Sequence, residues 1–399
     1  MTKLKDKKIL LGVTGSISVY KACELARSLI KAGATVRVVM TENATRFVSP
    51  MLFETLTGWK AYWRMFGDVE DNLAHINLSA WADIFLIAPA SANFIAKAAC
   101  GLADDLLTST LIAFDKKVLV APAMNNRMWA NPITQSNALR LKELGFEFVG
   151  PGRGALACGD IGEGRFAEIE DIVFAVERAV APASALAGKR VLISAGPTRE
   201  FLDDVRFLSN PSTGKMGFAL AREAALRGAR VTLVSGALDS PQIPSVQTLE
   251  VTTAAQMAER VFETAREADV IIMSAAVSDF TADKIKGKFK KGDNRTWRIE
   301  LKRTTDILAE LGATGLSAVL AGFAVETERE VENAREKLVR KNLDLIFVNN
   351  PNVPGTTFSA ETNAGYLIDR ESTERVEMMS KDALSGLILD KIEAILAAR

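Results

Sequence analysis

Several loops in the first half of the chain carry short polar side chains directly after apolar runs. Residues 14–18 (TGSIS) place hydroxyls and backbone N–H groups at the start of an expected helix, which suits a single phosphate. A tight turn without a ligand fits this segment equally well. Residues 89–93 (PASAN) and 122–129 (PAMNNRMW) follow two further apolar runs, and residues 157–165 (ACGDIGEGR) are Gly-rich and flexible enough for a lid. We expect the chemistry of this half at these segments.

Three single residues in this half have side chains suited to catalysis. His75 is the only histidine of the chain, although a lone histidine is more often a surface or satisfied core residue than a base. Asn125 carries an amide that can donate hydrogen bonds to a carboxylate. Cys158 lies in the Gly-rich segment, whereas Cys23 and Cys100 lie in apolar helical stretches and are expected to be inert.

The second half offers candidate anion and nucleotide sites. Residues 212–217 (STGKMG) open an expected helix; they lack the GxxxxGK spacing of a P-loop, but small residues at a helix start still suit an anion. Residues 273–280 (MSAAVSDF) end an apolar run, where small side chains let a flat base or a ribose approach the backbone and Asp279 can accept hydrogen bonds. The basic residues 284–291 (KIKGKFKK) fit a solvated surface and a lid over a triphosphate about equally.

Both halves begin with the same succession of elements. Residues 8–13 (KILLGV) and 189–194 (KRVLIS) are apolar runs that end in a turn, and each is followed by a helical stretch closing in glycine and by another apolar run. Strand, turn, helix, glycine and strand make a βαβ unit, and continuous apolar strands indicate a parallel sheet covered on both faces. The sequence therefore predicts an α/β protein whose ligands bind at the carboxyl ends of its strands.

The length of 399 residues indicates two domains rather than one core. Residues 181–188 (APASALAG) are typical of a linker. We therefore predict a first domain over residues 1–182 and a second over residues 188–399, each a mostly parallel sheet with helices on both faces.

Composition excludes several classes of protein. The chain has 49 basic and 49 acidic residues, which argues against a nucleic-acid-binding or membrane-surface protein. Three widely spaced cysteines form neither a disulfide framework nor a zinc motif and favour a reducing cytoplasm. No segment reaches the roughly 18 uninterrupted apolar residues of a membrane helix, and the first apolar run is too short and too broken by glycine for a signal peptide. We expect a cytoplasmic protein that acts on small molecules.

Two motifs in the first half resemble those of a known family. Residues 89–94 (PASANF) match the PASANT motif, with Phe94 in place of threonine, and residues 122–129 match PXMNXXMW. These motifs, in this order, resemble the homo-oligomeric flavin-containing cysteine decarboxylases over about residues 5–180. The resemblance implies a flavodoxin-like fold with FMN, acting on the cysteine of 4′-phosphopantothenoylcysteine.

The resemblance also implies roles for individual residues. His75 would be the base for the substrate thiol, Asn125 would hold the substrate carboxylate, and Cys158 would be the proton donor to the enethiolate. The residues it places at the flavin are Gly15, Ser16, Thr41, Ser91 and Asn93.

Motifs of the second half resemble the phosphopantothenate–cysteine ligase over about residues 188–395. They are residues 206–217 (RFLSNPSTGKMG), 274–280 (SAAVSDF) and 288–292 (KFKKG). The resemblance implies a Rossmann-like fold, CTP as co-substrate and Mg²⁺. It also implies that Asn210 handles an acyl-cytidylate intermediate and that Lys288 is required for the activation step that forms it. The nucleotide contacts that it implies are Ser212, Gly214, Gly217, Met273, Ser274, Ala275, Asp279, Thr305, Asp306, Ile307, Leu308, Phe323, Lys337 and Lys341.

The sequence departs from the ligase pattern at two places. The segment before Lys288 is one residue short and Lys284 offers a competing register, so either lysine could be the critical one. Thr305 replaces the usual proline before Asp306. The metal ligands and the preference for CTP over ATP stay open.

Three alternatives compete with a bifunctional enzyme of coenzyme A biosynthesis. A regulatory relative that has lost catalysis is disfavoured because His75, Asn125 and Cys158 are all present. A decarboxylase of peptide C-terminal cysteines is disfavoured by the ligase-like half, and an NAD-dependent dehydrogenase by the missing GxGxxG.

The family resemblance implies trimers through the flavin domain and dimers through the ligase domain, hence a dodecamer.

Overall fold

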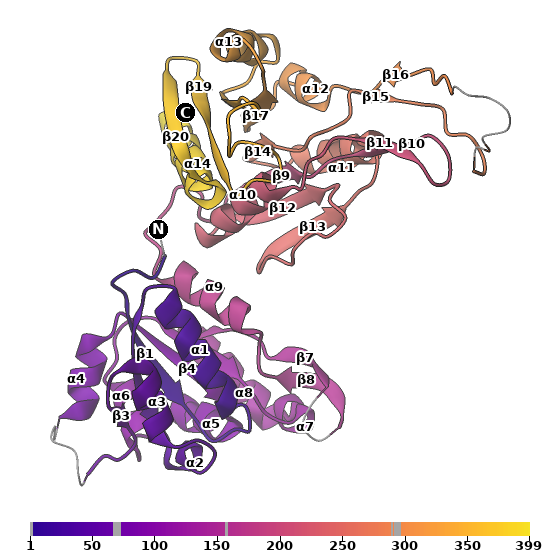
Figure 1. Cartoon of the computed structure of the whole chain (residues 1–399). Helices are drawn as coiled ribbons and strands as arrows, with labels where there is room; N and C mark the ends of the chain where they lie inside the picture. The colour runs from indigo at the N-terminus through magenta and orange to yellow at the C-terminus, as the bar shows by residue number, and fades with distance from the viewer. Residues whose placement is uncertain (1–2, 67–72, 156–158, 289, 291–296) are drawn as a thin grey trace. The chain divides into compact units, whose positions relative to one another are not determined.

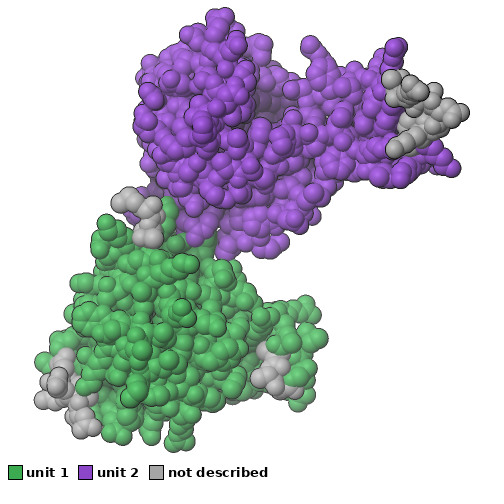
Figure 2. Space-filling model, in the orientation of Figure 1, with its two compact units in different colours: residues 1–181 green, residues 182–399 purple. Residues whose placement is uncertain are grey.

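The computed structural model describes residues 3–66, 73–155, 159–288, 290 and 297–399. The chain divides into two compact units, Met1–Ala181 and Pro182–Arg399 (Figure 2).

Unit 1 is built on a six-stranded parallel sheet with the order β3-β2-β1-β4-β5-β6. Its central strands are the continuous apolar runs of the sequence, and they are buried because helices cover both faces. Without the two-residue edge strand β3, the order is that of the flavodoxin-like sheets. The strands are β1 Lys8–Val13, β2 Thr35–Met40, β3 Ala61–Tyr62, β4 Ile84–Ala90, β5 Val118–Pro122 and β6 Glu147–Phe148.

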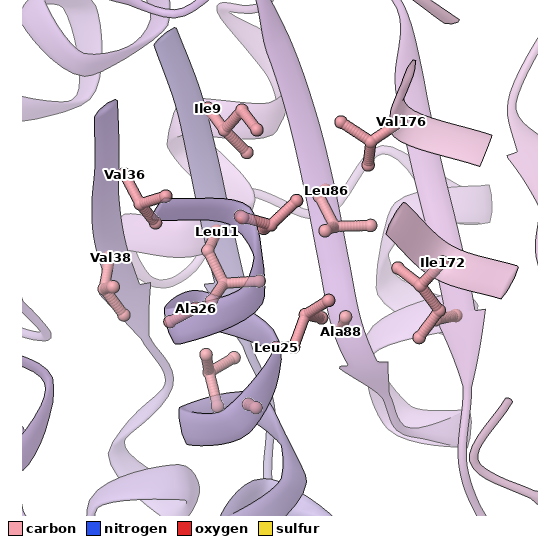
Figure 3. Close-up of a cluster of buried hydrophobic side chains, with 14 of the residues drawn as sticks. Ile9, Leu11, Leu25, Ala26, Val36, Val38, Leu86, Ala88, Ile172 and Val176 are labelled. Atoms are coloured by element: carbon pink, nitrogen blue, oxygen red, sulfur yellow. The ribbon is translucent and has the colours of Figure 1, made fainter. Parts of the chain in front are cut away.

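The helices of unit 1 pack on the two faces of this sheet (Figure 1). Leu11 and Leu86 point to one face, where they pack with α1 and α9 (Figure 3), whereas Leu10 and Phe85 point to the other face with α5 and α6. The helices are α1 Val19–Lys31, α2 Glu42–Thr45, α3 Pro50–Thr57, α4 Ala74–Trp81, α5 Ala92–Cys100, α6 Leu106–Ile112, α7 Asn126–Ala130, α8 Pro132–Glu143 and α9 Ile169–Ala179. A separate antiparallel hairpin joins β7 Gly152–Ala155 to β8 Ile161–Arg165, so part of the expected flexible segment is a strand.

Unit 2 is built on an eight-stranded sheet with the order β13-β12-β9-β14-β17-β18-β19-β20. The first six of these are parallel in the doubly wound order 3-2-1-4-5-6, and the last two add an antiparallel edge. The predicted mostly parallel sheet is confirmed in both units. The strands are β9 Arg190–Ala195, β12 Arg230–Ser235, β13 Val246–Glu250, β14 Val270–Met273, β17 Val319–Val325, β18 Leu345–Asn349, β19 Thr362–Asp369 and β20 Thr373–Ser380.

Helices flank the unit 2 sheet, and two short antiparallel ribbons extend from it (Figure 1). The helices are α10 Lys215–Leu226, α11 Ala254–Ala265, α12 Ile307–Ala313, α13 Glu330–Arg340 and α14 Lys381–Ala398. The ribbons are β10 Arg199–Phe201 with β11 Phe207–Ser209, and β15 Phe280–Thr281 with β16 Lys302–Arg303.

Each sheet reverses its strand order beside its first strand. The reversal lies between β1 and β4 in unit 1 and between β9 and β14 in unit 2. Open α/β sheets bind ligands in the crevice outside the carboxyl ends of such strands. Within the described residues, no helix combines the length and the apolar character that crossing a membrane requires.

Candidate functional site

Three of the polar segments predicted in the first half meet at the carboxyl edge of the unit 1 sheet. The Thr14 Oγ1 donates to the carbonyl of Pro89 at 2.8 Å and accepts from the Ser91 amide at 2.8 Å. The Ser16 Oγ donates to the carbonyl of Ala123 at 3.0 Å. These bonds tie the loops after β1, β4 and β5 together at the strand-order reversal.

The predicted flavin-binding hydroxyls also hold this local structure. Thr41 caps α2, and Ser91 caps α5 by accepting from the Phe94 amide at 3.3 Å. Gly15 has no room for a side chain, because a Cβ there would lie 2.7 Å from the Cβ of Asn43. Asn93 is exposed in the first turn of α5.

Backbone groups at the start of α1 fit the phosphate of a flavin nucleotide. The amides of Gly15 and Ile17 donate to no protein acceptor within the described residues. Because α1 begins at Val19, these amides lie at its positive end, where an anion is stabilised.

Asn125 lies beside the β7–β8 hairpin. It caps α7, and its Oδ1 accepts from the Arg127 amide at 2.8 Å, which orients the side-chain amide. The Met124 amide donates to the Gly164 carbonyl at 2.9 Å, and a Cβ on Gly164 would collide with the Met124 carbonyl. Gly164 therefore permits close packing of the hairpin against the Asn125 loop. Cys158 lies outside the described residues.

His75 is the second residue of α4 and is half-buried. Its Nδ1 is buried and has no hydrogen-bond partner in the described part of the chain. Buried ring nitrogens normally have a partner, so this atom fits a site that a ligand completes.

The second site is a cavity of about 410 Å³ at the carboxyl ends of β14, β17 and β18. Its wall brings together every predicted ligase-site residue except Lys288. The predicted residues that line it are Asn210, Ser212, Gly214, Gly217, Met273, Ser274, Ala275, Asp279, Thr305, Asp306, Ile307, Leu308, Phe323, Lys337 and Lys341.

Two glycines shape the cavity wall at the start of α10. Gly214 has a φ of +80°, a left-handed conformation that favours glycine, and a Cβ there would lie 2.8 Å from the Phe218 ring. A Cβ on Gly217 would lie 2.5 Å from the Cβ of Ala195 and 2.8 Å from the Ser274 Oγ. The first turn of α10 can therefore approach the ends of β9 and β14 closely.

Asn210 lines the same cavity, and two hydrogen bonds hold its side chain. Its Nδ2 donates to the carbonyls of Ala276 at 3.1 Å and Val277 at 3.3 Å. The amide is thus held beside residues 273–280, where its oxygen stays oriented.

The two predicted cavity lysines are each paired with a carboxylate. The Lys341 Nζ lies 2.8 Å from Asp306, which also caps α12, and Lys337 pairs with Glu326. Burial opposes the ionisation of Asp306, but the hydrogen bond from Lys341 outweighs it and keeps the pKa of Asp306 below its ordinary value. The charges of both lysines are therefore already matched by protein carboxylates.

The basic segment does not reach the cavity wall in the described residues. Lys284 pairs with Asp204 at 2.7 Å, and the Gly287 amide donates to the same carboxylate at 2.9 Å. Lys288 is exposed. The end of the segment, residues 289 and 291–296, lies outside the described part of the chain.

Sequence reasoning missed several residues of the cavity wall. Lys215 stood inside a quoted motif and was given no role, whereas the others lie beyond Lys341, where no site residue was predicted. The missed residues include Lys215, Asn349, Phe358, Asn363 and Lys381. Within the described ranges, no group of three or more His, Cys, Asp or Glu side chains could hold a metal ion.

Comparisons with known proteins match both units. The family "Flavoprotein" matches residues 1–181, and the family "DNA/pantothenate metabolism flavoprotein C-terminal domain" matches residues 186–396. The coenzyme A biosynthesis bifunctional protein CoaBC of Bacillus subtilis is 44% identical over 398 residues, covering 98% of each chain.

Two solved structures each correspond to one half of the chain. The C-terminal domain of a CoaBC protein is 36% identical and covers 54% of this chain and 100% of its own, with a TM-score of 0.47. The FMN-dependent cysteine decarboxylase SpaF is 34% identical and covers 45% of this chain and 99% of its own, with a TM-score of 0.40.

The full-length identity and the two family matches cover both units in the same order as in the bifunctional relatives. The chain therefore belongs to the CoaBC family of bifunctional coenzyme A biosynthesis enzymes, which have phosphopantothenoylcysteine decarboxylase and synthetase activities.

Proposed function

We propose that unit 2 joins 4′-phosphopantothenate to cysteine with CTP and that unit 1 decarboxylates the product to 4′-phosphopantetheine with FMN. The observation that carries the proposal is the 410 Å³ cavity, whose wall gathers fifteen separately predicted residues of the ligase. Strand-end loops at the reversal point of the unit 1 sheet support a flavin site in the same way.

In the ligase reaction, the cavity would hold the nucleotide along its length. The half-buried ring of Phe323 offers a surface for the base, and Asp279 can accept from the ribose hydroxyls. Residues 212–217 lie at the N-terminus of α10, where backbone N–H groups and the helix dipole favour negative charge and would bind the α-phosphate. Mg²⁺ would neutralise part of the negative charge of the phosphates.

The chemistry of this step is an acyl activation. A carboxylate oxygen of 4′-phosphopantothenate attacks the α-phosphorus, and pyrophosphate leaves. The cysteine amine then attacks the acyl carbon and displaces CMP. Asn210, held by Ala276 and Val277, is oriented to contact the acyl-cytidylate.

In the decarboxylation, FMN when bound supplies the temporary acceptor for a hydride, which gives the substrate an electron sink for the loss of CO₂. His75 would take the thiol proton, a role that its unpartnered Nδ1 supports. Asn125 would hold the carboxylate through its oriented amide. Cys158 would return a proton to the enethiolate.

Exposed apolar side chains support the proposed homo-oligomer. Ile17 and Tyr20 are more than half exposed next to the flavin-site loop, and Phe207 and Phe280 are exposed on the ribbons of unit 2. Surfaces of this kind are typical of subunit interfaces. We propose a trimer through unit 1 and a dimer through unit 2, which together give a dodecamer.

The test is mass spectrometry of the purified flavin-loaded chain incubated with CTP, Mg²⁺, cysteine and 4′-phosphopantothenate. We expect 4′-phosphopantetheine, CMP and pyrophosphate, and a slower reaction when ATP replaces CTP. Flavin absorbance should accompany the chain through purification. Absence of both flavin after reconstitution and nucleotide cleavage would refute the proposal.

A further inference from the structure

One part of the unit 2 cavity carries positive charge that the roles above do not use. Lys381, the first residue of α14, lines the cavity although only 6% of its surface is exposed. Lys215, the first residue of α10, lines the same cavity. Burial lowers the pKa of Lys381, and the nearby charge of Lys215 lowers it further. The two ammonium groups are held close together by neighbouring carbonyls, because the Lys215 Nζ donates to Ser359 at 2.9 Å and the Lys381 Nζ donates to Phe358 at 3.0 Å.

Protein carboxylates neutralise this pair only in part. Glu361 pairs with Lys215, but its side chain is 81% exposed. Lys381 instead donates to the carbonyls of Phe358 at 3.0 Å and Thr357 at 3.5 Å. An ammonium has three N–H donors, so one remains for a ligand. Because a buried ammonium without a directly paired carboxylate is costly, an anionic ligand here would stabilise it.

A neutral donor adds to this part of the wall. Asn363 is 6% exposed and lines the cavity. Its Oδ1 accepts from the Ala364 amide at 3.0 Å, while its Nδ2 has no acceptor in the described residues. Lys215 directly follows Gly214 at the start of α10, where backbone N–H groups favour an anion. The side-chain donors of Lys215, Lys381 and Asn363 therefore line the same cavity as this helix start.

We infer that Lys215, Lys381 and Asn363 form a subsite for the pyrophosphate portion of the nucleoside triphosphate. The inference rests on the proposed function, which places the α-phosphate at residues 212–217. When the substrate carboxylate attacks, the bond between the α-phosphorus and the bridging oxygen breaks, and pyrophosphate keeps the electron pair. The two ammonium groups stabilise the charge that develops on this leaving group.

The experiment compares three ligands on one variant of the full-length, flavin-loaded chain. Lys381→Met removes the charge and keeps the side-chain length. We expect calorimetric titration to show binding of inorganic pyrophosphate and of CTP weakened about tenfold, the loss of one charge-assisted hydrogen bond. Affinity for CMP, which lacks the two outer phosphates, should be unchanged.

A second variant moves affinity in the opposite direction. Glu361→Gln removes the exposed carboxylate that pairs with Lys215, so pyrophosphate should bind more tightly. This variant leaves the buried lysine and its carbonyl contacts intact, and it therefore tests charge without disturbing the residue 357–358 backbone.

Three outcomes would overturn the inference. If Lys381→Met binds pyrophosphate with unchanged affinity, the proposed subsite does not exist. If the variant loses affinity for CMP and CTP equally, Lys381 only supports the backbone of residues 357–358. Weaker binding of 4′-phosphopantothenate with normal binding of pyrophosphate assigns the lysines to the other substrate. A wild-type chain that binds pyrophosphate through Lys381 but forms no acyl-cytidylate would refute the proposed function and leave the anion subsite standing.

Discussion

Lys284 and Lys288, the two candidates for the activating lysine, have different surroundings. Lys284 pairs with Asp204 at 2.7 Å, and this hydrogen bond is the main reason that the pKa of Asp204 lies below its ordinary value. Lys288 is exposed, with no carboxylate partner in the described residues. A lysine that must contact a phosphate during catalysis needs its charge available, which favours Lys288.

We therefore predict that Lys288→Gln slows acyl-cytidylate formation about 100-fold, the usual loss when one charge-stabilising donor is removed. Lys284→Gln should retain most of the activity, because its charge is already paired with Asp204. Release of pyrophosphate measures the step, and flavin content checks that unit 1 is unaffected. The reverse ranking of the two variants would show that Lys284 is the critical residue.

What the sequence predicted at the residue scale depends on where each residue lies. Asp279 follows an apolar run at a strand end and Ser212 opens an expected helix, so pattern and resemblance both located them. Lys381 is the first residue of α14, which follows β19 and β20 in the chain. Only the tertiary fold brings this residue to the cavity. Its burial could not be predicted, because a lysine at a helix start is ordinarily exposed.

At the scale of elements, the position of α10 controls the cavity wall. Gly217 in its first turn lets the helix contact Ala195 and Ser274, whereas Gly386 in α14 has only ordinary contact at 3.7 Å with Arg227. Both glycines are helical, so their intrinsic helix propensities are equal and their surroundings decide the effect of a side chain.

We predict opposite effects for alanine at these two positions. Gly217→Ala should destabilise unit 2 by about 1–3 kcal/mol, because α10 must move away from the strand ends, and it should weaken CTP binding. Gly386→Ala should stabilise by about 0.5–1 kcal/mol, the helix-propensity difference. Urea unfolding followed by circular dichroism measures both. A neutral Gly217→Ala variant would contradict the close packing of α10.

An ion pair whose strength depends on pH joins the antiparallel edge of unit 2 to α14. Lys391 lies 2.8 Å from Asp369 in β19. Burial opposes ionisation of Asp369, but hydrogen bonds from Lys391 and from the Glu371 and Ser372 amides outweigh it and lower its pKa to about 2. A carboxyl with a depressed pKa contributes stability above its unfolded pKa of 3.8, and the contribution is lost as the pH falls toward 2.

We predict that Asp369→Asn lowers the free energy of unfolding of unit 2 by up to about 2 kcal/mol at pH 7. The difference from the wild type should shrink between pH 4 and pH 2, where the wild-type carboxyl becomes protonated. Lys391→Met should show a similar loss at neutral pH. A difference that stays constant down to pH 2 would rule out ionisation as its source.

At the scale of the whole molecule, the sequence predicted two α/β domains because both halves repeat the same apolar strands and glycine turns. It did not predict β19 and β20, the antiparallel edge of unit 2. Most side chains of β20 are exposed, so the strand lacks the continuous apolar run that marked its parallel neighbours. It pairs with β19 through the short turn at residues 370–372, and the hairpin takes its place in the sheet because β19 pairs with β18.

The two units should work when separated, because each has its own core. Among the described residues, the hydrophobic clusters within unit 1 contain no residue beyond 181, and the cluster described in unit 2 contains none before 182. Expressed alone, residues 1–181 should bind flavin and decarboxylate added phosphopantothenoylcysteine, while residues 182–399 should make that compound from CTP, cysteine and 4′-phosphopantothenate. Mixing the two should restore formation of 4′-phosphopantetheine, because the intermediate can diffuse between them. If a folded, separated unit is inactive and regains activity only when joined to the other, the sites depend on each other.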